Sequence, residues 1–371
     1  MRRFLLSVVL TALVAFSARA DELPPTLKLG SKAPDFNLPG VDGKNWSLKD
    51  FSNAKLLVVI FTCNHCPTAQ YYEGRIKDLT TKYKDKGVSV VCIMPNDPKS
   101  VRLDELAWTD LSDTFPEMKR RAKDRDFNFP YLYDGDTEEV SKAYGPVVTP
   151  HAYVFDGDRV LRYVGAIDDS ERIQKVKTRY VENALDALLS GKQPEVAQTK
   201  VVGCSIKWKG KEKQNEEFME KLAQEPVSLE KADAAALADL RKNSSGKFRL
   251  VNFWATWCAP CVAEFDELVA MNRSYRMRDF EMVTVSLNRP DEENSVLGFL
   301  KKKQASGRNL IFASDQREPL INAFDPEWQG VVPYTLLISP EGKVIYKEIG
   351  SIDTHALRGA IVAAMNERKP W

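Results

Sequence analysis

Two segments of this chain, far apart in the sequence, repeat one pattern. The first begins at Ala54 with AKLLVVIFTCNHCPTAQYYEGRI, and the second begins at Lys247 with KFRLVNFWATWCAPCVAEFDELV. Each contains a β-rich apolar run, a C-x-x-C pair, and then apolar residues at helical spacing. Each cysteine pair is therefore expected at the point where a strand turns into a helix.

A second unit is also repeated further along each copy. TPHAYVFDGDRVLRYVGAID (149–168) and VPYTLLISPEGKVIYKEIGSID (332–353) each give X-Pro, a strand, a Gly turn and a second strand. Further strands are expected in VSVVCIM (88–94) and EMVTVSL (281–287), with helical stretches between the strands. Strands that alternate with helices predict an α/β fold with a sheet in each copy.

The length and composition fit two globular domains. The chain has 371 residues, of which 43% are hydrophobic and 28% charged, and one ordinary core does not grow to that size. We expect a signal peptide over 1–20, a first domain over 21–192, a linker with Cys204 over 193–226, and a second domain over 227–371. The charge-rich KWKGKEKQNEE in the linker interrupts the periodic pattern.

The first twenty residues indicate export. MRR is a basic head, an apolar stretch follows, and Ala18-Arg19-Ala20 is a small-residue cleavage signature. We expect cleavage after Ala20, a location in the periplasm or cell envelope, and no stable membrane insertion, because the apolar stretch is short for a bilayer.

The rest of the chain has a net charge of −2, because 53 basic side chains become 50 when the three arginines of the first twenty residues are left out, against 52 acidic ones. Nothing in this balance indicates a nucleic-acid partner.

The cysteines indicate redox chemistry without a cofactor. Six cysteines are too few for a disulfide-stapled scaffold of this length, and four of them form the two C-x-x-C pairs. A helix N-terminus lowers the pKa of a thiol placed there. Cys63 and Cys258 are therefore expected to attack, and Cys66 and Cys261, one turn further on, to resolve the mixed disulfide.

Strand, C-x-x-C, helix and a later proline before a hairpin resemble the thioredoxin superfamily. The resemblance implies two thioredoxin-like domains, each a mixed β-sheet flanked by helices. It also implies that Pro150 and Pro333 are cis-prolines beside the cysteine pairs, and that the preceding Thr149 and Val332 dock substrate. The plain alternative for each proline is an ordinary turn.

The second copy, NFWATWCAPCVAEF, is similar to exported thiol–disulfide reductases of the TlpA and ResA type. That group has a glutamate three residues beyond the resolving cysteine, here Glu264, which would exchange protons with the thiols. The alternative is a surface carboxylate at a helix start. Trp257 is expected to offer apolar surface to a substrate. The group usually has Pro where this chain has Asp266, which loosens the subfamily assignment.

The first copy resembles the redoxin (AhpC/TSA-like) branch, in its opening GSKAPDFNLPGVDGKNWSLKDF and in FNFPYLYDGDTEEVSKAYG. Its C-N-H-C-P centre and later G-C-S-I-K-W (203–208) are similar to a bacterial redoxin type. The branch includes peroxiredoxins, so an antioxidant thiol peroxidase is an alternative function, with Cys63 attacking peroxide and Cys66 or Cys204 resolving. The Thr and Pro that peroxiredoxins place before the attacking cysteine are absent.

The histidine between the first pair predicts a direction of electron flow. When protonated, His65 favours the Cys63 thiolate and makes that disulfide more oxidising, whereas Ala259-Pro260 offers no such charge. Electrons are therefore expected to pass from the second domain to the first. An unidentified thiol donor upstream, and protein thiols and disulfides of the cell envelope, are the expected partners.

Two features keep other functions open. Cys63, Cys66, His65 and His151 are a ligand set for copper(I), so a copper-binding module is a further alternative. Cys204 is either a third thiol that folds back toward the first pair or a packed cysteine without a role. Cys92, in an apolar strand, is expected to be a buried small hydrophobe.

Overall fold

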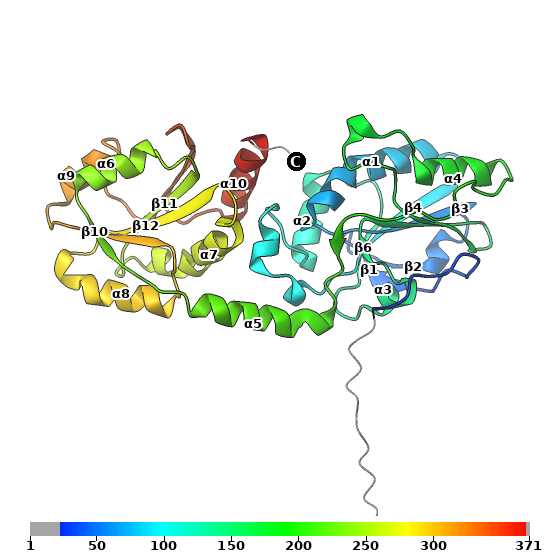
Figure 1. Ribbon diagram of the computed structural model, residues 1–371, viewed down its shortest axis with the longest axis horizontal. Coiled ribbons are helices and arrows are strands. Elements are labelled where there is room, and N and C mark those ends of the chain that lie inside the picture. Colours follow the sequence, from blue (N-terminus) through cyan, green and yellow to red (C-terminus); the bar gives the residue numbers. More distant parts are fainter. Residues whose placement is uncertain (1–22, 369–371) are drawn as a thin grey trace, which may run out of the picture.

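The computed structural model describes residues 23–368, which form two α/β units joined by a helix (Figure 1). The expected signal peptide lies outside the described residues. Within the described residues, no helix has both the length and the apolar composition needed to cross a membrane. The two units correspond to the two copies of the repeated pattern.

The first unit is a five-stranded mixed sheet in the order β5-β4-β3-β7-β8. The central β3 runs parallel to β4 and antiparallel to β7. Both faces of the sheet are covered, so all six residues of β3 are buried. A strand that is buried on both faces is a continuous apolar run in the sequence. The strands are β3 (Leu56–Phe61), β4 (Val88–Met94), β5 (Tyr131–Tyr133), β7 (His151–Phe155) and β8 (Leu161–Gly165).

Helices α1 and α4 cover one face of the first sheet, and α3 with an N-terminal hairpin covers the other. Two short strands, β6 and β9, pair with each other outside the main sheet. The bounds are α1 (Pro67–Lys84), α2 (Phe115–Asp124), α3 (Glu139–Tyr144), α4 (Tyr180–Leu189), β1 (Asn37–Pro39), β2 (Asn45–Ser47), β6 (Val148–Thr149) and β9 (Cys204–Ser205).

The second unit repeats this plan with a six-stranded mixed sheet in the order β10-β13-β12-β11-β14-β15. Its central β11 is parallel to β12 and antiparallel to β14. The strands are β10 (Glu230–Ala232), β11 (Phe248–Trp254), β12 (Phe280–Ser286), β13 (Arg308–Phe312), β14 (Tyr334–Ile338) and β15 (Val344–Ile349).

Helices α7, α8 and α10 pack on one face of the second sheet, and α6 and α9 pack on the other. The predicted fold class is therefore confirmed, with strands at both expected positions and helices between them. The bounds are α6 (Ala234–Lys242), α7 (Ala259–Tyr275), α8 (Glu293–Lys302), α9 (Arg317–Phe324) and α10 (Thr354–Arg368).

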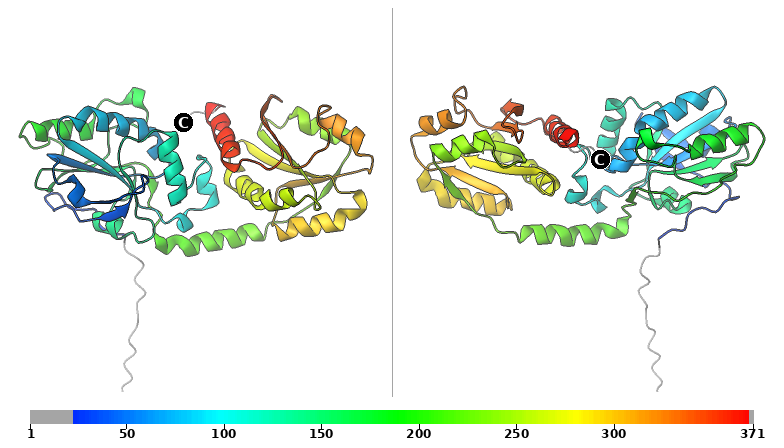
Figure 2. Two further views of the ribbon diagram at one scale, coloured as in Figure 1. Left: turned by 180° about the vertical axis from the view of Figure 1, so that it is seen from behind. Right: turned by 45° about the horizontal axis from the view of Figure 1, so that its top comes forward.

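The segment predicted as a linker has two different parts. Its first part packs on the first unit, where β9 pairs with β6 and the side chains of Ile206 and Trp208 are buried. Its second part is the helix α5 (Glu212–Ala223), which connects the two units along one side of the molecule in each view (Figure 2). The charge-rich stretch is therefore a helical bridge from Glu212 on, whereas its first residues, Lys207 and Trp208, pack on the first unit.

The two units also contact each other directly. The Tyr275 hydroxyl, at the C-terminal end of α7, donates a hydrogen bond to the Thr109 carbonyl oxygen at 3.0 Å. Just beyond it, the Arg278 guanidinium lies 3.7 Å from the ring centre of Trp108. The interface thus involves the end of α7 that is remote from its cysteines.

Candidate functional site: two cysteine pairs at helix starts

The first cysteine pair lies where the central strand β3 ends and α1 begins. Cys66 is the N-cap of α1, with Pro67 at the first helical position, and its sulfur accepts a hydrogen bond from the Ala69 backbone N–H at 3.4 Å. Proline is favoured there because it needs no N–H partner. The sulfur of Cys66 therefore sits against the free N–H groups of a helix start, a place that the sequence pattern assigns to Cys63.

The loop before β7 holds both sulfurs of this pair. The Thr149–Pro150 peptide bond is cis, as predicted. The Thr149 hydroxyl lies 3.1 Å from Cys63 Sγ, and in its thiol form Cys66 donates to the Thr149 carbonyl oxygen at 3.3 Å. Thr149 thus contacts the two cysteines with two different atoms.

A third thiol is present at the same place. Thr149 in β6 pairs in antiparallel register with Cys204 in β9, and the Cys204 thiol donates a hydrogen bond to Cys66. Cys204 is partly buried and packs against the same apolar core as the first pair. The structure therefore places Cys204 beside Cys66, which is one of its two expected positions. Cys92 is fully buried in β4.

His65 forms a buried ion pair with Asp113. Its Nδ1 lies 2.6 Å from Asp113 Oδ2, and both side chains are almost inaccessible. Burial disfavours both charges, yet the attraction raises the pKa of His65 and lowers the pKa of Asp113. The Asp113 carboxylate thus favours the protonated form of the His65 ring next to the thiols.

The carboxylate of Asp113 accepts four hydrogen bonds, three from the loop of the cysteine pair and one from Asn96. Oδ1 accepts from the backbone N–H of Asn64 at 2.8 Å and of His65 at 3.0 Å. Oδ2 accepts from the His65 ring and, at 2.7 Å, from the Asn96 side-chain amide. Asp113 therefore fixes the backbone, the ring orientation and the charge of His65 together.

The three thiols differ in their tendency to ionise: the hydrogen bond that Cys204 donates to Cys66, together with burial, raises the pKa of Cys204. Burial raises the pKa of Cys63 well above its usual value. Burial also opposes ionisation of Cys66, but hydrogen bonds from the Cys204 and Cys63 thiols and the charge of His65 bring its pKa well below the usual value. Cys66 is thus the favoured thiolate, whereas the sequence indicated Cys63; the attacking role of Cys63 stays a prediction.

The expected copper ligands do not form one group with ligand-like spacing among residues 23–368, and the copper ligand set stays a prediction. His151 is buried, burial lowers its pKa to about 4, and its Nδ1 lies 3.4 Å from the Val147 N–H and from the Tyr153 hydroxyl. Among residues 23–368, the group with ligand-like spacing is Cys63, His65 and Asp113, whose atoms lie within 4.8 Å of one another. The saturated carboxylate does not fit a ligand role. A metal at this place would have three potential ligand atoms, the two sulfurs and Nε2 of His65. This Nε2 is buried without a hydrogen-bond partner among the described residues.

The second pair also lies at a helix start, but here the first cysteine of the pair, not the second, is the N-cap. Cys258 is the N-cap of α7, the Cys261 N–H donates to its sulfur at 3.3 Å, and the two cysteines form a disulfide. The Val332–Pro333 bond is cis, as predicted. This pair has Ala259 and Pro260 between its cysteines, so it lacks a counterpart of the His65 charge.

Glu264 lies behind the second pair, nine-tenths buried and not on the surface. Its Oε2 accepts a hydrogen bond from the Ile352 N–H at 3.0 Å, and its Oε1 lies 3.5 Å from the Asn252 amide. Burial raises the pKa of Glu264. A buried carboxyl one turn from Cys261 with a raised pKa suits proton exchange with the thiols; its catalytic role stays a prediction.

The two cis-proline edges differ in accessibility. At the first centre, β9 pairs with Thr149, and Cys63 and Cys66 are buried. At the second centre Cys258 and Cys261 are buried too, at 6% and 1% exposure, but no strand among the described residues pairs with Val332, and Trp257 beside the disulfide is 55% exposed. The second edge is open to an extended partner, and the first is covered.

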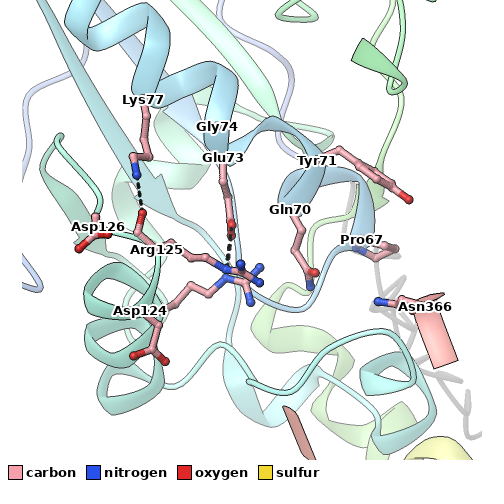
Figure 3. Close-up of a pocket in the computed structure, with 11 residues that line it drawn as sticks. Pro67, Gln70, Tyr71, Glu73, Gly74, Lys77, Asp124, Arg125, Asp126 and Asn366 are labelled. Carbon is pink, nitrogen blue, oxygen red and sulfur yellow. Dashed lines mark hydrogen bonds and ion pairs between the residues drawn. The ribbon is translucent and has the colours of Figure 1, made fainter. Parts of the chain in front are cut away.

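A hollow lies along the exposed side of α1, beginning at Pro67 (Figure 3). In it, Glu73 forms an ion pair with Arg121 at 2.7 Å, and the Lys77 ammonium donates a hydrogen bond to the Arg125 carbonyl oxygen at 2.7 Å. No thiol lines this hollow. It therefore gives no route to the first pair.

Sequence reasoning missed Asp113 and Asn96. Both are ordinary polar residues in segments far from the cysteine pair, and no spacing connects them to it. Asn96 also accepts from the Lys207 N–H at 2.9 Å, so it joins the G-C-S-I-K-W segment to Asp113. The only signal available was the G-C-S-I-K-W resemblance itself.

Comparison with protein families assigns both units. Residues 29–164 match the AhpC/TSA family, and residues 221–361 match the family described as Redoxin. This chain is a tandem of two redoxin-type domains. Both domains of the tandem redoxin have the thioredoxin-like fold.

Individual relatives carry related names. The thiol-disulfide oxidoreductase ResA of Bacillus subtilis is 31% identical over 116 residues, which are 31% of the tandem redoxin and 58% of ResA. The thiol:disulfide interchange protein CycY of Rhizobium leguminosarum is 26% identical over 38% of this chain and 70% of its own. A solved structure of an uncharacterized conserved protein from Geobacillus kaustophilus is 38% identical, covers 49% of this chain and 93% of its own, and has a TM-score of 0.44.

Proposed function

We propose that the tandem redoxin is a thiol–disulfide oxidoreductase with two redox centres, Cys63–Cys66 and Cys258–Cys261. The observation that carries the proposal is that each C-x-x-C pair caps a helix beside a cis-proline. A helix start favours the thiolate, which is the species that attacks a disulfide. The names of ResA and CycY support the same chemistry.

The second centre is the one that meets protein disulfides. Its edge at Val332 is open, and the exposed indole of Trp257 offers apolar surface beside Cys258. An extended substrate segment pairs with such an edge through its backbone. In this proposal Cys258 attacks, Cys261 resolves, and Glu264 exchanges protons with them.

The test is a redox titration of the full-length protein. The protein is equilibrated in a series of thiol–disulfide buffers, free thiols are trapped, and all six cysteines are mapped by peptide mass. Two reversible disulfides, 63–66 and 258–261, each with its own potential, are expected. If neither pair cycles between thiol and disulfide, the proposal is wrong.

We propose that electrons flow from the second centre to the first. The buried charge of His65 stabilises the Cys66 thiolate, hence the reduced form, and makes the first disulfide the better oxidant. Two full-chain variants, one retaining only the first pair and one only the second, are equilibrated with each other. A second pair that proves the stronger oxidant overturns this direction.

We propose that this relay does not pass through the observed contact between the units. Tyr275 is one contact between the units, and His355 at the start of α10 also pairs with Asp124 of the first unit at 3.3 Å. A helix rises about 1.5 Å per residue, so Cys261 lies on the order of 20 Å along α7 from the Tyr275 contact. Transfer therefore requires either a rearrangement about α5 or an intermediate thiol carrier. Comparing transfer rates within one chain and between two chains distinguishes these routes.

The AhpC/TSA match of the first domain supports a second candidate function, thiol peroxidase activity with Cys63 attacking peroxide. Rapid loss of hydrogen peroxide coupled to oxidation of Cys63 supports it, and no loss above the rate of free cysteine excludes it.

Copper(I) binding by the first pair is tested separately, by measuring copper uptake. Reduced protein that takes up no stoichiometric copper(I) excludes a carrier role.

We also propose export to the cell envelope, on the basis of the basic head, the apolar stretch and the Ala18-Arg19-Ala20 signature. Cell fractionation and N-terminal sequencing test this, with Asp21 expected as the first residue of the mature chain. Recovery of the uncleaved chain in the cytoplasm contradicts it.

A further inference from the structure

The first cysteine pair is buried, and its cis-proline edge is covered by β9. Cys63 is 3% exposed and Cys66 is fully buried. The β9 strand occupies the cis-proline edge on which an extended substrate would pair. The thiol at this centre with partial exposure is Cys204.

The position of Cys204 is set by a close backbone contact. Gly203 lies so near Thr149 that a Cβ on this glycine would come 2.0 Å from the Thr149 carbonyl oxygen. That same oxygen contacts Cys66 Sγ at 3.3 Å. Only a glycine at position 203 lets the strand approach closely enough for the Cys204 and Cys66 thiols to meet.

The segment that carries Cys204 is firmly attached on its other side. The Lys207 N–H donates to Asn96, the Asp97 N–H donates to the Lys207 carbonyl oxygen at 2.9 Å, and the Lys207 ammonium pairs with Glu105 at 2.5 Å. Ile206 is 1% exposed. The segment is therefore a fixed part of the centre, unlike a flap that opens for substrate.

We propose that Cys204 is the shuttle thiol of the first centre, which carries disulfide exchange between the buried Cys63–Cys66 pair and disulfides of outside partners. The proposal rests on the thiol–disulfide exchange function proposed above. Val147 and Val202, on either side of this short strand pair, are 42% and 69% exposed. They fit a partner that presents its disulfide on an apolar surface.

The exchange proceeds in three balanced steps. Cys204 attacks the partner disulfide R–S–S–R as its proton passes to the neighbouring Cys66 thiolate, and R–S⁻ leaves from the Cys204 mixed disulfide. Cys66 then gives its proton to the departing thiolate and attacks Cys204 Sγ, which releases the second R–S⁻ and forms Cys66–Cys204.

In the last step Cys63 attacks Cys66 Sγ, forms Cys63–Cys66 and releases Cys204. The Cys63 proton passes to the second leaving thiolate, and Cys204 leaves as a thiolate, so the negative charge that began on Cys66 ends on Cys204. Two electrons have moved from the buried pair to the partner, which is reduced to two thiols. The reverse sequence reduces the buried pair with an outside dithiol.

The first experiment measures how fast oxidised glutathione converts the reduced full-length protein to the 63–66 disulfide, by acid quench and peptide mass. The Cys204→Ser variant should slow this reaction at least about tenfold, because the exposed entry point is lost. The Cys92→Ser variant, which removes another thiol of the same domain, should leave the rate unchanged. An unchanged rate in Cys204→Ser overturns the shuttle role while leaving two-centre exchange intact.

The second experiment looks for the intermediate. In Cys63→Ser the last step is blocked, so oxidation should accumulate the 66–204 disulfide, with Cys92 free as an internal control. Adding Gly203→Ala should lower the yield of this disulfide because the strand is pushed from Thr149, whereas Gly74→Ala, which meets nothing within 4 Å, should not. If Cys66 and Cys204 instead stay unlinked, the proposal is wrong.

The same intermediate can be sought in the unmodified protein, so that poor folding of a variant does not decide the question. A 66–204 peptide that rises and then falls before 63–66 supports the shuttle. Its absence at all quench times refutes it. A protein in which 63–66 never forms refutes the exchange function itself, which is a separate outcome.

Discussion

Replacing Asp113 with asparagine should remove the charge that His65 brings to the first cysteine pair. The variant keeps the size of the side chain but turns one of its acceptor oxygens into an N–H₂ donor, facing donors that now lack a partner. Without the carboxylate, burial and the charge of Lys207 favour the neutral ring, and the Cys66 thiolate opposes them. The pKa of His65 should then fall, by about 1–3 units for the loss of an opposite charge in contact.

The consequence for the thiols follows from the same charge. Neutral His65 no longer stabilises the Cys66 thiolate, so the pKa of Cys66 should rise. One pKa unit corresponds to about 1.4 kcal/mol, which is about 30 mV for a two-electron couple. We therefore expect the first disulfide to become less oxidising by about 30 mV for each unit that the thiol pKa rises.

Two measurements check this prediction. Thiolate absorbance and alkylation rate against pH give the titration of Cys66, and glutathione equilibration gives the potential. Asp110→Asn is the matched control, since it removes a carboxylate of the same segment that pairs with Arg121 at 3.3 Å and contacts no thiol. If Asp113→Asn folds yet leaves both the titration and the potential unchanged, the ion pair is not what tunes the centre.

The ion pair between His65 and Asp113 should also make the free energy of unfolding depend on pH. The pKa of Asp113 is lowered, so its contribution is complete above the ordinary aspartate pKa of 3.8 and is lost as pH falls through the lowered value. The pKa of His65 is raised, so its contribution is complete below 6.5 and is lost as pH rises through the raised value. The difference in unfolding free energy between wild type and Asp113→Asn should be greatest between these limits, on the order of 3–5 kcal/mol.

Three further predictions concern the second domain. Glu264→Gln should slow thiol exchange at the second pair by about a hundredfold and remove a titration above pH 4.5 from its pH profile; Glu267→Gln, which alters a 54% exposed carboxylate, should do neither. Trp257→Ala should raise KM for a protein disulfide about tenfold while leaving the potential of the pair unchanged, and an unchanged KM would count against docking at this edge. Tyr275→Phe removes the hydrogen bond to Thr109 and should weaken the contact between the units by about 0.5–1.5 kcal/mol, measured as faster proteolysis within α5; equal proteolysis would show that this bond does not hold the units together.

The fold could be predicted from the sequence because its signals are local and occur twice. A buried central strand is an apolar run, a helix start has its proline, and the hairpin after the cis-proline has its glycine turn. Each signal lies within about twenty residues. The repeat then confirms each assignment against its counterpart.

The electrostatics of the first centre could not be predicted in this way. His65 and Asp113 meet through the tertiary fold, and nothing near Asp113 distinguishes it from the chain's other aspartates. The ionisation order of Cys63 and Cys66 depends in turn on that pair and on a thiol from β9. The sequence could nominate Cys204 but not place it, because a two-residue strand has no periodicity to read.

The helix α5 has a consequence for kinetics. A twelve-residue helix is about 18 Å long and resists bending over that length, so it acts as a short, stiff tether between the two domains. Tethering replaces the bulk concentration of a reaction partner with a local one, of millimolar order for short linkers that reach. If the two centres exchange electrons within one chain, the rate will not fall when the protein is diluted, as it must for two separate proteins.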